Sequence, residues 1–328
     1  MRAAVLTADH AFDVSDVPDP TPREGELVLR VNACGICGSD LKAYKSMPSG
    51  TVMGHEFSGE IAAIGPGVEG AWSEGDLVAA MPLGSCGRCR WCLAGEPAHC
   101  ERVDMIGVGG SSGGFAEYVR VEAGASVHLD PSVGPAGAMV EPLAVGLHTV
   151  VAGDIKPGDR VLVIGGGNVG VAVAIWARRL GAAEVVVSDP SAARREGAPT
   201  FGATGVHNPS DGPATPGFDV VFECVGAPGL IQAAVDAAAV KGRVVVAGVL
   251  TAPDQILPIL AVLKEVQVRF AVYYRGDEFA AAAALLNGGG VNVDAFVDAT
   301  VDLGGVQGAF ERLTTVGGDG KVLVIPSP

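Results

Sequence analysis

The spacing of apolar residues changes about midway along the chain. Up to about residue 142, short β-branched runs are separated by Gly and Pro turns such as Gly65-Pro66-Gly67. This pattern is typical of a small antiparallel barrel. The strands that it predicts cover residues 26–31, 59–64, 76–80 and 115–121.

From Asp159 onward, apolar strands alternate with alanine-rich helical stretches. Strands that are buried on both faces and separated by helices predict a parallel, doubly wound sheet. The expected strands cover residues 160–164, 184–188, 218–223, 243–248 and 266–273, and the expected helices cover residues 169–180 and 230–240. A further helix (278–286) and a terminal strand (321–325) follow.

Length and charge narrow the class of protein. A chain of 328 residues corresponds to about two domains. Its net charge of −15 argues against a nucleic-acid partner, which requires a basic face. The N-terminus lacks the apolar core of a signal peptide, and no apolar run of membrane-spanning length is free of charges or glycine clusters. We therefore expect a cytoplasmic enzyme with no membrane partner.

A glycine-rich turn follows the strand predicted at 160–164. The sequence from Val161 reads VLVIGGGNVG, which contains the G-x-G-x-x-G pattern of dinucleotide-binding proteins. In that pattern Gly165 makes the tight turn, Gly167 lets the backbone approach a pyrophosphate, and Gly170 permits close helix packing. The pyrophosphate would lie at the helix N-terminus, where free N–H groups favour anions.

The end of the next strand bears on the choice of dinucleotide. Asp189 stands where an acid binds the adenosine ribose hydroxyls and repels the additional phosphate of NADP. We therefore expect NAD. Arg194 and Arg195 follow closely and leave NADP open as the alternative.

Four cysteines form the most specific local pattern in the chain. Their spacing is C-x2-C-x2-C-x7-C, in a lobe of about residues 84–102. Four thiolates on one short segment can bind a single Zn²⁺ tetrahedrally as a closed, structural site. The last spacing departs from the bacterial ferredoxin pattern, which favours zinc over an iron–sulfur cluster. The predicted ligands are Cys86, Cys89, Cys92 and Cys100.

Cys37, His55 and Glu141 are candidates for a functional site only when they are considered together. Each has a plain structural explanation, and their spacing alone does not define a metal site. Cys34 and Cys37 form a C-x-x-C pair, so a redox function is a further possibility.

In its motifs the chain resembles the zinc-dependent medium-chain alcohol dehydrogenases, and most closely their polyol and threonine dehydrogenase branch. The resemblance rests on CGICGSD (34–40), GHEFSG (54–59), the four-cysteine lobe, EPLAVGLH (141–148) and the glycine turn, in family order. It implies an α/β fold class: a GroES-like β-barrel catalytic domain (1–142), a doubly wound Rossmann domain (143–274), and a C-terminal segment (275–328) that returns to the first domain.

The resemblance also implies a catalytic zinc site. In it Cys37, His55 and Glu141 hold the metal and leave the fourth position open, and Glu56 is a residue that some members bring onto the metal. Asp40 would orient the zinc-binding histidine.

Two further positions bear on the proton that the alcohol hydroxyl would release. By resemblance, Ser39 would accept it. Many relatives continue the relay with a histidine where this chain has Lys42, so the route beyond Ser39 stays open.

On the cofactor side, the resemblance implies that main-chain amides bind the pyrophosphate and that later strand ends meet the nicotinamide. The residues concerned are Asn168 and Val169 for the pyrophosphate, Arg194 for the ribose, and Val225, Gly248 and Val249 for the nicotinamide.

The implied function is hydride transfer between a secondary alcohol or polyol and NAD, giving the ketone or aldehyde. The implied cofactors are two Zn²⁺ per chain and NAD, and the implied assembly is a homodimer or homotetramer acting on a small alcohol or carbonyl. Two alternatives remain: an NADPH-dependent carbonyl or enone reductase, and a non-catalytic zinc and nucleotide-binding redox sensor.

Overall fold

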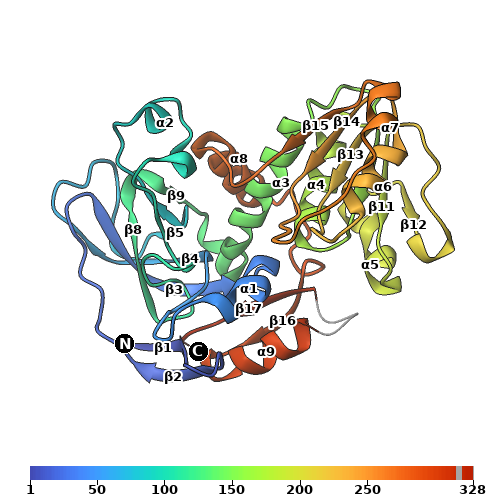
Figure 1. Cartoon of the computed structure of the whole chain (residues 1–328). Coiled ribbons are helices and arrows are strands. Elements are labelled where there is room, and N and C mark those ends of the chain that lie inside the picture. The colour runs from blue at the N-terminus through green and yellow to red at the C-terminus, as the bar shows by residue number, and fades with distance from the viewer. Residues whose placement is uncertain (315–319, 328) are drawn as a thin grey trace. The chain divides into compact units, whose positions relative to one another are not determined.

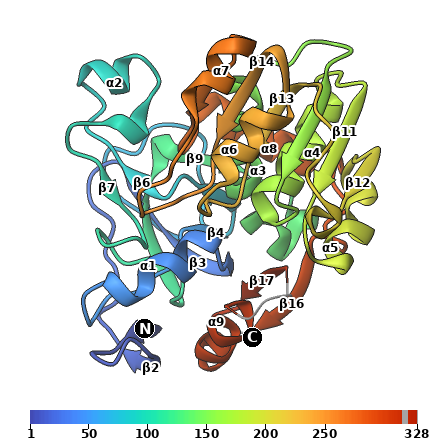
Figure 2. The same cartoon turned by 45° about the vertical axis from the view of Figure 1, so that its right-hand side comes forward.

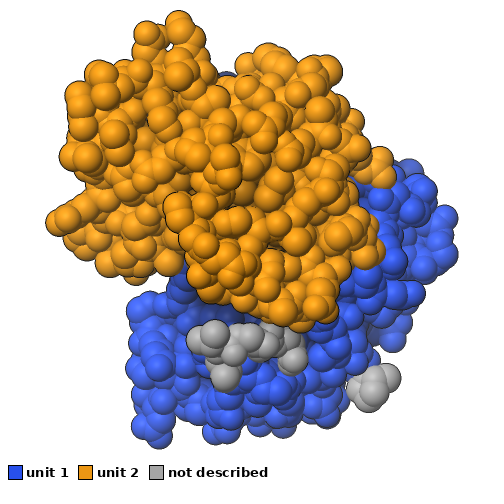
Figure 3. Space-filling model, turned by 90° about the vertical axis from the view of Figure 1, so that its right-hand side faces the viewer, with its two compact units in different colours: residues 1–141, 275–328 blue, residues 142–274 orange. Residues whose placement is uncertain are grey.

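A computed structural model describes residues 1–314 and 320–327, which fold as two units (Figure 1). Unit 1 comprises Met1–Glu141 and Arg275–Pro328, and unit 2 comprises Pro142–Tyr274 (Figure 3). Unit 1 is therefore discontinuous in sequence, with unit 2 inserted into it. The chain passes from unit 1 to unit 2 after Glu141 and returns to unit 1 after Tyr274.

Unit 2 is built on a six-stranded parallel sheet of order β12-β11-β10-β13-β14-β15. The strand order reverses between β10 and β13, and ligands of such sheets bind at the carboxyl ends beside this point. This arrangement confirms the doubly wound class. The strands are β10 (Arg160–Ile164), β11 (Glu184–Ser188), β12 (Gly205–His207), β13 (Phe218–Glu223), β14 (Ala238–Val246) and β15 (Gln267–Phe270).

Helices cover this sheet because its strands are apolar on both faces. Helix α4 packs on β10 and β11, and α6 packs on β13 and β14 (Figure 2). Leu162, Val221 and Val244, from three adjacent strands, are fully buried beneath α6 and its neighbours. The helices are α3 (Val140–Ala152), α4 (Asn168–Arg179), α5 (Ala192–Gly197), α6 (Leu230–Ala237) and α7 (Pro258–Lys264).

The helix expected at 230–240 ends earlier than its alanine-rich sequence suggests. Ala238 adopts an extended conformation (ψ 144°) and pairs with Phe218 as the start of β14. The ammonium of Lys264 donates to the main-chain carbonyls of Val235, Asp236 and Ala238, at 3.2, 2.7 and 3.0 Å. A cation at the last carbonyls stabilises a helix end. The tertiary contact therefore outweighs the helix propensity of alanine.

Unit 1 holds a mainly antiparallel sheet in which β3 is the central strand. The order is β16-β17-β3-β4-β5-β9, and β8 also pairs with β3. These strands are β3 (Glu26–Gly35), β4 (Glu56–Ile64), β5 (Leu77–Ala80), β8 (Tyr118–Glu122), β9 (Ser126–His128), β16 (Val297–Val301) and β17 (Lys321–Val324). The smaller elements are β1 (Arg2–Leu6), β2 (Phe12–Asp16), β6 (Leu83–Gly84), β7 (Asp104–Met105), α1 (Gly38–Ala43), α2 (Arg90–Leu93), α8 (Gly276–Asn287) and α9 (Val306–Leu313).

The C-terminal segment completes this sheet. Strand β17 pairs antiparallel with the end of β3, where Leu323 lies opposite Gly35 and Val324 opposite Cys34. Strand β16 runs parallel to β17 at the sheet end. The last strand of the chain therefore lies beside the segment that leads to Cys37.

One helical stretch, Pro131–Ala152, is long and apolar enough to span a membrane by length and composition alone. Within its apolar 18-residue window, 67% is buried inside the protein, and Gly134 (φ 52°) interrupts the helix. Core helices of globular proteins have the same properties, and we interpret the stretch as one of them.

Candidate functional site

The β3–β4 pair brings together Cys37, His55 and Glu56, three residues of the expected catalytic site. Strand β3 ends at Gly35, and Cys37 then caps α1, where its N–H donates to the Asp40 carboxylate at 2.9 Å. His55 immediately precedes β4, whose first residue, Glu56, lies opposite Gly35 in the register. The cysteine, the histidine and the glutamate therefore converge from two neighbouring strand ends.

Three donor groups at this point can hold a metal ion. The side-chain ligand atoms of Cys37, His55 and Glu56 all lie within 4.8 Å of one another. Thiolate, imidazole and carboxylate are the ligands that zinc takes in proteins, so the residues fit the expected metal. Glu141 lies in the first turn of α3 and is buried, but it does not belong to this group of three.

The surroundings of His55 select which ring nitrogen faces the other donors. Nδ1 lies 3.2 Å from the carboxylate of the fully buried Asp40, and Nε2 lies 3.4 Å from the hydroxyl of Ser39. Burial opposes the charged imidazolium, but the Asp40 carboxylate and the neighbouring Cys37 together outweigh burial and raise the pKa of His55 well above its ordinary value. Asp40 thus has the geometry of a residue that orients a metal-binding histidine.

The sequence interpretation missed a buried cation at this site. Lys321, the first residue of β17, is fully buried; its ammonium donates to the Glu56 carboxylate and, at 3.2 Å, to the carbonyl of Ile36. Burial lowers the pKa of Lys321, whereas Glu56 raises it, and the net shift is upward. A Cβ on Gly35 would lie 2.1 Å from the Glu56 carboxylate, so this pair requires glycine there. In the sequence, the signal for this buried cation was a single lysine as the first residue of an apolar strand.

Cys34 takes no part in the group of three. It is fully buried, and burial raises the pKa of its thiol well above the ordinary value. The thiolate is the reactive form of cysteine, so this environment argues against a Cys34–Cys37 redox pair.

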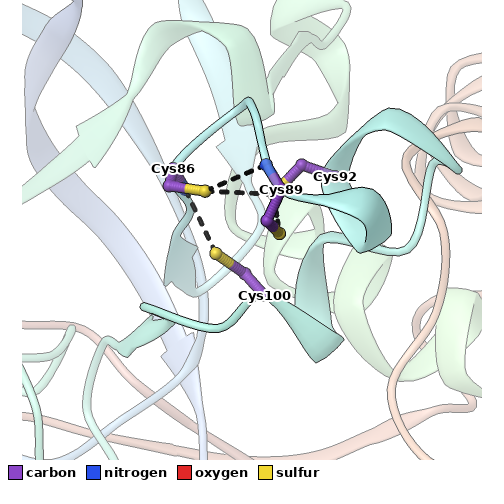
Figure 4. A group of neighbouring side chains, drawn as sticks. All are labelled: Cys86, Cys89, Cys92 and Cys100. Carbon is purple, nitrogen blue, oxygen red and sulfur yellow. Dashed lines mark hydrogen bonds between the residues drawn. The ribbon is translucent and has the colours of Figure 1, made fainter.

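The four cysteines of the lobe form a second group. Their sulfur atoms also lie within 4.8 Å of one another (Figure 4). The N–H groups of Cys86 and Arg102 both donate to the sulfur of Cys100 at 3.3 Å, and that of Cys89 donates to Cys86 at 3.4 Å. The main-chain N–H groups of Arg88 and Cys89 lower the pKa of Cys86 to about 6. Four converging sulfurs with a stabilised thiolate fit a structural zinc site.

Replacing Cys92 by serine should remove this structural metal and leave the catalytic group intact. We expect zinc content to fall from two ions to one per chain, and Tm to fall by about 5–10 °C because the lobe loses its folding energy. Metal analysis together with differential scanning calorimetry measures both. Unchanged zinc content in the variant would show that the lobe does not hold the ion.

In unit 2 the glycine turn has the geometry of a dinucleotide site. Gly165 (φ 99°) turns the chain out of β10, and a Cβ on Gly170 would lie 1.8 Å from the carbonyl oxygen of Gly165. A Cβ on Gly167 would meet only the Arg194 guanidinium, at 4.0 Å, so the space beside this residue is open. Asn168 and Val169 then begin α4, whose N-cap, Gly167, supplies no side-chain cap. The helix N-terminus can therefore receive an anion.

Asp189 follows β11 and is nearly fully buried. Its carboxylate accepts the N–H groups of Gly166 and Ser191, both at 2.8 Å, and lies 3.5 Å from the Arg194 guanidinium. Arg195 donates to the Asp189 carbonyl at 2.6 Å. Both arginines are thus turned toward Asp189.

The positions expected at the nicotinamide lie in two neighbouring turns. Val225 follows β13, and Gly248 and Val249 follow β14, the adjacent strand. Both turns lie at the carboxyl end of the sheet, the edge where such folds bind ligands.

Comparison with known proteins agrees with both units. The profile of the alcohol dehydrogenase GroES-like domain matches residues 23–131, and that of the zinc-binding dehydrogenase matches residues 168–288.

Individual relatives extend over almost the whole chain. A 2-dehydro-3-deoxy-L-galactonate 5-dehydrogenase from Pseudoalteromonas atlantica is 33% identical over 95% of both chains. Sorbitol dehydrogenase of Bacillus subtilis is 30% identical over 76% of this chain and 75% of its own. A zinc-binding dehydrogenase of Sinorhizobium meliloti 1021, solved with NADP bound, superposes with a TM-score of 0.91 at 32% identity over 99% of both chains.

Proposed function

Because the chain belongs to the zinc-binding alcohol dehydrogenase family and is therefore an NAD(P)-dependent oxidoreductase, we propose that it oxidises a secondary alcohol or polyol with NAD. The observation that carries this proposal is the group formed by Cys37, His55 and Glu56, with Ser39 beside the histidine. Relatives that act on a sugar acid and on sorbitol support a polyhydroxylated substrate.

In this proposal Cys37, His55 and a carboxylate would hold the catalytic zinc. The carboxylate would be either Glu141 or Glu56, and the closeness of Glu56 to Cys37 and His55 supports Glu56. When bound, the zinc would supply a Lewis acid that lowers the pKa of the alcohol hydroxyl, and the nicotinamide would supply the hydride acceptor. Asp40 holds His55 in the tautomer whose Nε2 faces the metal, and Ser39 receives the alcohol proton at its hydroxyl oxygen. Lys42 lies one turn later on α1, so the proton passes from Ser39 either to Lys42 or to solvent.

A panel of alcohols tests the proposed function. Purified zinc-loaded protein would be mixed with NAD and with sorbitol, 2,3-butanediol or sugar acids, and formation of reduced cofactor would be followed by absorbance. Oxidation of at least one secondary alcohol is expected. Failure with every alcohol, together with NADPH-dependent reduction of carbonyl compounds, would establish the reductase alternative instead.

Replacing Asp189 by asparagine should change the cofactor preference. We propose that this carboxylate binds the ribose hydroxyls and repels the phosphate of NADP; its removal should raise the NADP-to-NAD affinity ratio by about tenfold. Dissociation constants from titration calorimetry measure the ratio. Asp211→Asn, an exposed acid of the same unit, is the control and should leave the ratio unchanged. Tighter binding of NADP than NAD by the wild type would favour the NADPH-dependent reductase, which Arg194 also supports.

We further propose that the protein is a cytoplasmic homo-oligomer assembled through β15 and α7. The reducing cytoplasm would keep the zinc-binding thiols free. Strand β15 ends the sheet of unit 2, and exposed apolar side chains gather on it and on α7. An edge strand with such side chains is a template for pairing with another chain. Those side chains include Ile259 (50% exposed), Val262 (66%), Leu263 (72%) and Phe270 (74%), and the N-cap residue of α7, Leu257 (56%), adjoins them.

Phe270→Glu should therefore shift the protein toward monomers. The new charge would be buried without a partner in the proposed interface, which is costly. Size-exclusion chromatography with light scattering measures the mass. Val206→Glu, on the opposite edge strand β12, is the matched control and should leave the oligomer intact. A Phe270→Glu variant of unchanged mass would contradict this interface.

A further inference from the structure

One residue, Glu223, forms hydrogen bonds with both turns that would meet the nicotinamide, and its carboxylate is buried. Glu223 ends β13 and is 1% exposed. Its side-chain oxygen Oε1 accepts the N–H groups of Val225 and Gly226, both at 2.8 Å. Its main-chain carbonyl accepts those of Ala247 and Gly248, both at 2.9 Å. One residue thus fixes the turn after β13 and the turn after β14.

Among the residues that the structure describes, no lysine, arginine or histidine forms an ion pair with the carboxylate of Glu223. The turns are also tightly packed, since a Cβ on Gly248 would lie 2.4 Å from Oε2 of Glu223. The two N–H groups stabilise the negative charge without neutralising it.

The negative charge of Glu223 affects the next residue in the chain, Cys224. Burial is the main cause that raises the pKa of the Cys224 thiol, and the charge of Glu223 raises it further. The carboxylate therefore opposes additional negative charge nearby and favours positive charge.

The two redox forms of the cofactor differ in charge at the ring. The oxidised nicotinamide carries a positive charge, whereas the reduced ring is neutral, and the pyrophosphate and adenosine are the same in both. A fixed negative charge beside the ring therefore distinguishes the two forms, and it does so more strongly in a water-poor site.

We propose that Glu223 is a specificity-determining residue that favours binding of the oxidised, cationic nicotinamide over binding of the reduced ring. This preference would bias the enzyme toward alcohol oxidation. This inference rests on the proposed dinucleotide function. In the favoured direction the alcohol carbon gives a hydride to C4 of the ring, the hydroxyl loses its proton, and ketone and reduced cofactor form. Glu223 does not exchange atoms with either reactant.

Glu223→Gln separates charge from geometry. Glutamine keeps a side-chain oxygen that can accept both N–H groups, but it is neutral. Dissociation constants of NAD⁺, NADH and ADP-ribose would be measured by titration calorimetry on the zinc-loaded holoenzyme without substrate. The Kd of NAD⁺ should rise about tenfold, while those of NADH and ADP-ribose should change by less than about twofold. Glu223→Asp, which keeps the charge, should retain the wild-type ratio of NAD⁺ to NADH affinity.

The other outcomes overturn the inference. An equal rise in the Kd of NAD⁺ and NADH would show that Glu223 only shapes the turns, and no change would show that its charge does not reach the ring. If Glu223→Gln does not fold, the dissociation constants of the wild type provide the test. The wild type should bind NAD⁺ at least as tightly as NADH, and clearly weaker binding of NAD⁺ overturns the inference. Wild-type protein that binds neither ADP-ribose nor NAD⁺ would instead refute the proposed function.

Discussion

Replacing Cys37 by serine is expected to lower kcat/KM for alcohol oxidation by about a thousandfold or more. Cys37 supplies the one thiolate in the group with His55 and Glu56, and a serine hydroxyl is a far weaker zinc ligand. The variant should also lose one of its two zinc ions, because only the four-cysteine lobe would retain its metal. Steady-state kinetics and metal analysis on the same preparation measure both effects.

Cys34→Ser is the matched control for this substitution. Cys34 lies three positions earlier on β3, is fully buried, and lies outside the group of three ligands. We expect its activity to stay within about threefold of the wild type, since serine is nearly isosteric with cysteine. Two retained zinc ions and unchanged turnover in Cys37→Ser would refute the catalytic zinc site. Equal losses in both variants would revive the redox-pair alternative.

Local motifs made the metal lobe and the dinucleotide turn predictable. The four cysteines lie on one short segment, so their spacing alone limits the geometry that they can adopt. The glycine turn is likewise local: Gly165 needs its positive φ, and Gly170 needs to lack a side chain. Such requirements are visible in the sequence because each depends on residues only a few positions away.

Features that depend on distant residues were not predictable in the same way. Lys321 is 265 positions from Glu56, and no periodicity relates an ammonium in the last strand to a carboxylate at the start of β4. The early end of α6 likewise depends on Lys264, which reaches its last carbonyls from α7. The buried carboxylate of Glu223 resembled an ordinary strand end in sequence. Lys321 and Lys264 share one property, since each is a cation whose partners are distant in sequence and are brought near by the tertiary fold.

Lys321→Met is expected to destabilise unit 1 by about 3–5 kcal/mol. Removing the ammonium would leave the Glu56 carboxylate buried without its cation, and an uncompensated buried charge costs about this much. The lysine also ties β17 to β3 through the carbonyl of Ile36, so the C-terminal strand would lose an anchor. Urea denaturation, followed by tryptophan fluorescence and by circular dichroism, measures the change in the free energy of unfolding.

The double variant Lys321→Met with Glu56→Gln distinguishes charge compensation from simple packing. If the cost arises from the unpaired carboxylate, then removing both charges should recover most of the lost stability, because a neutral pair avoids the desolvation penalty. Arg30→Met is the control, since Arg30 pairs with Glu60 at 2.5 Å on the exposed surface of the same sheet. Exposed pairs contribute little, and we expect this variant to lose less than about 1 kcal/mol. A cost for Lys321→Met as small as that of Arg30→Met would show that the Lys321 ammonium is not the group that compensates the Glu56 carboxylate.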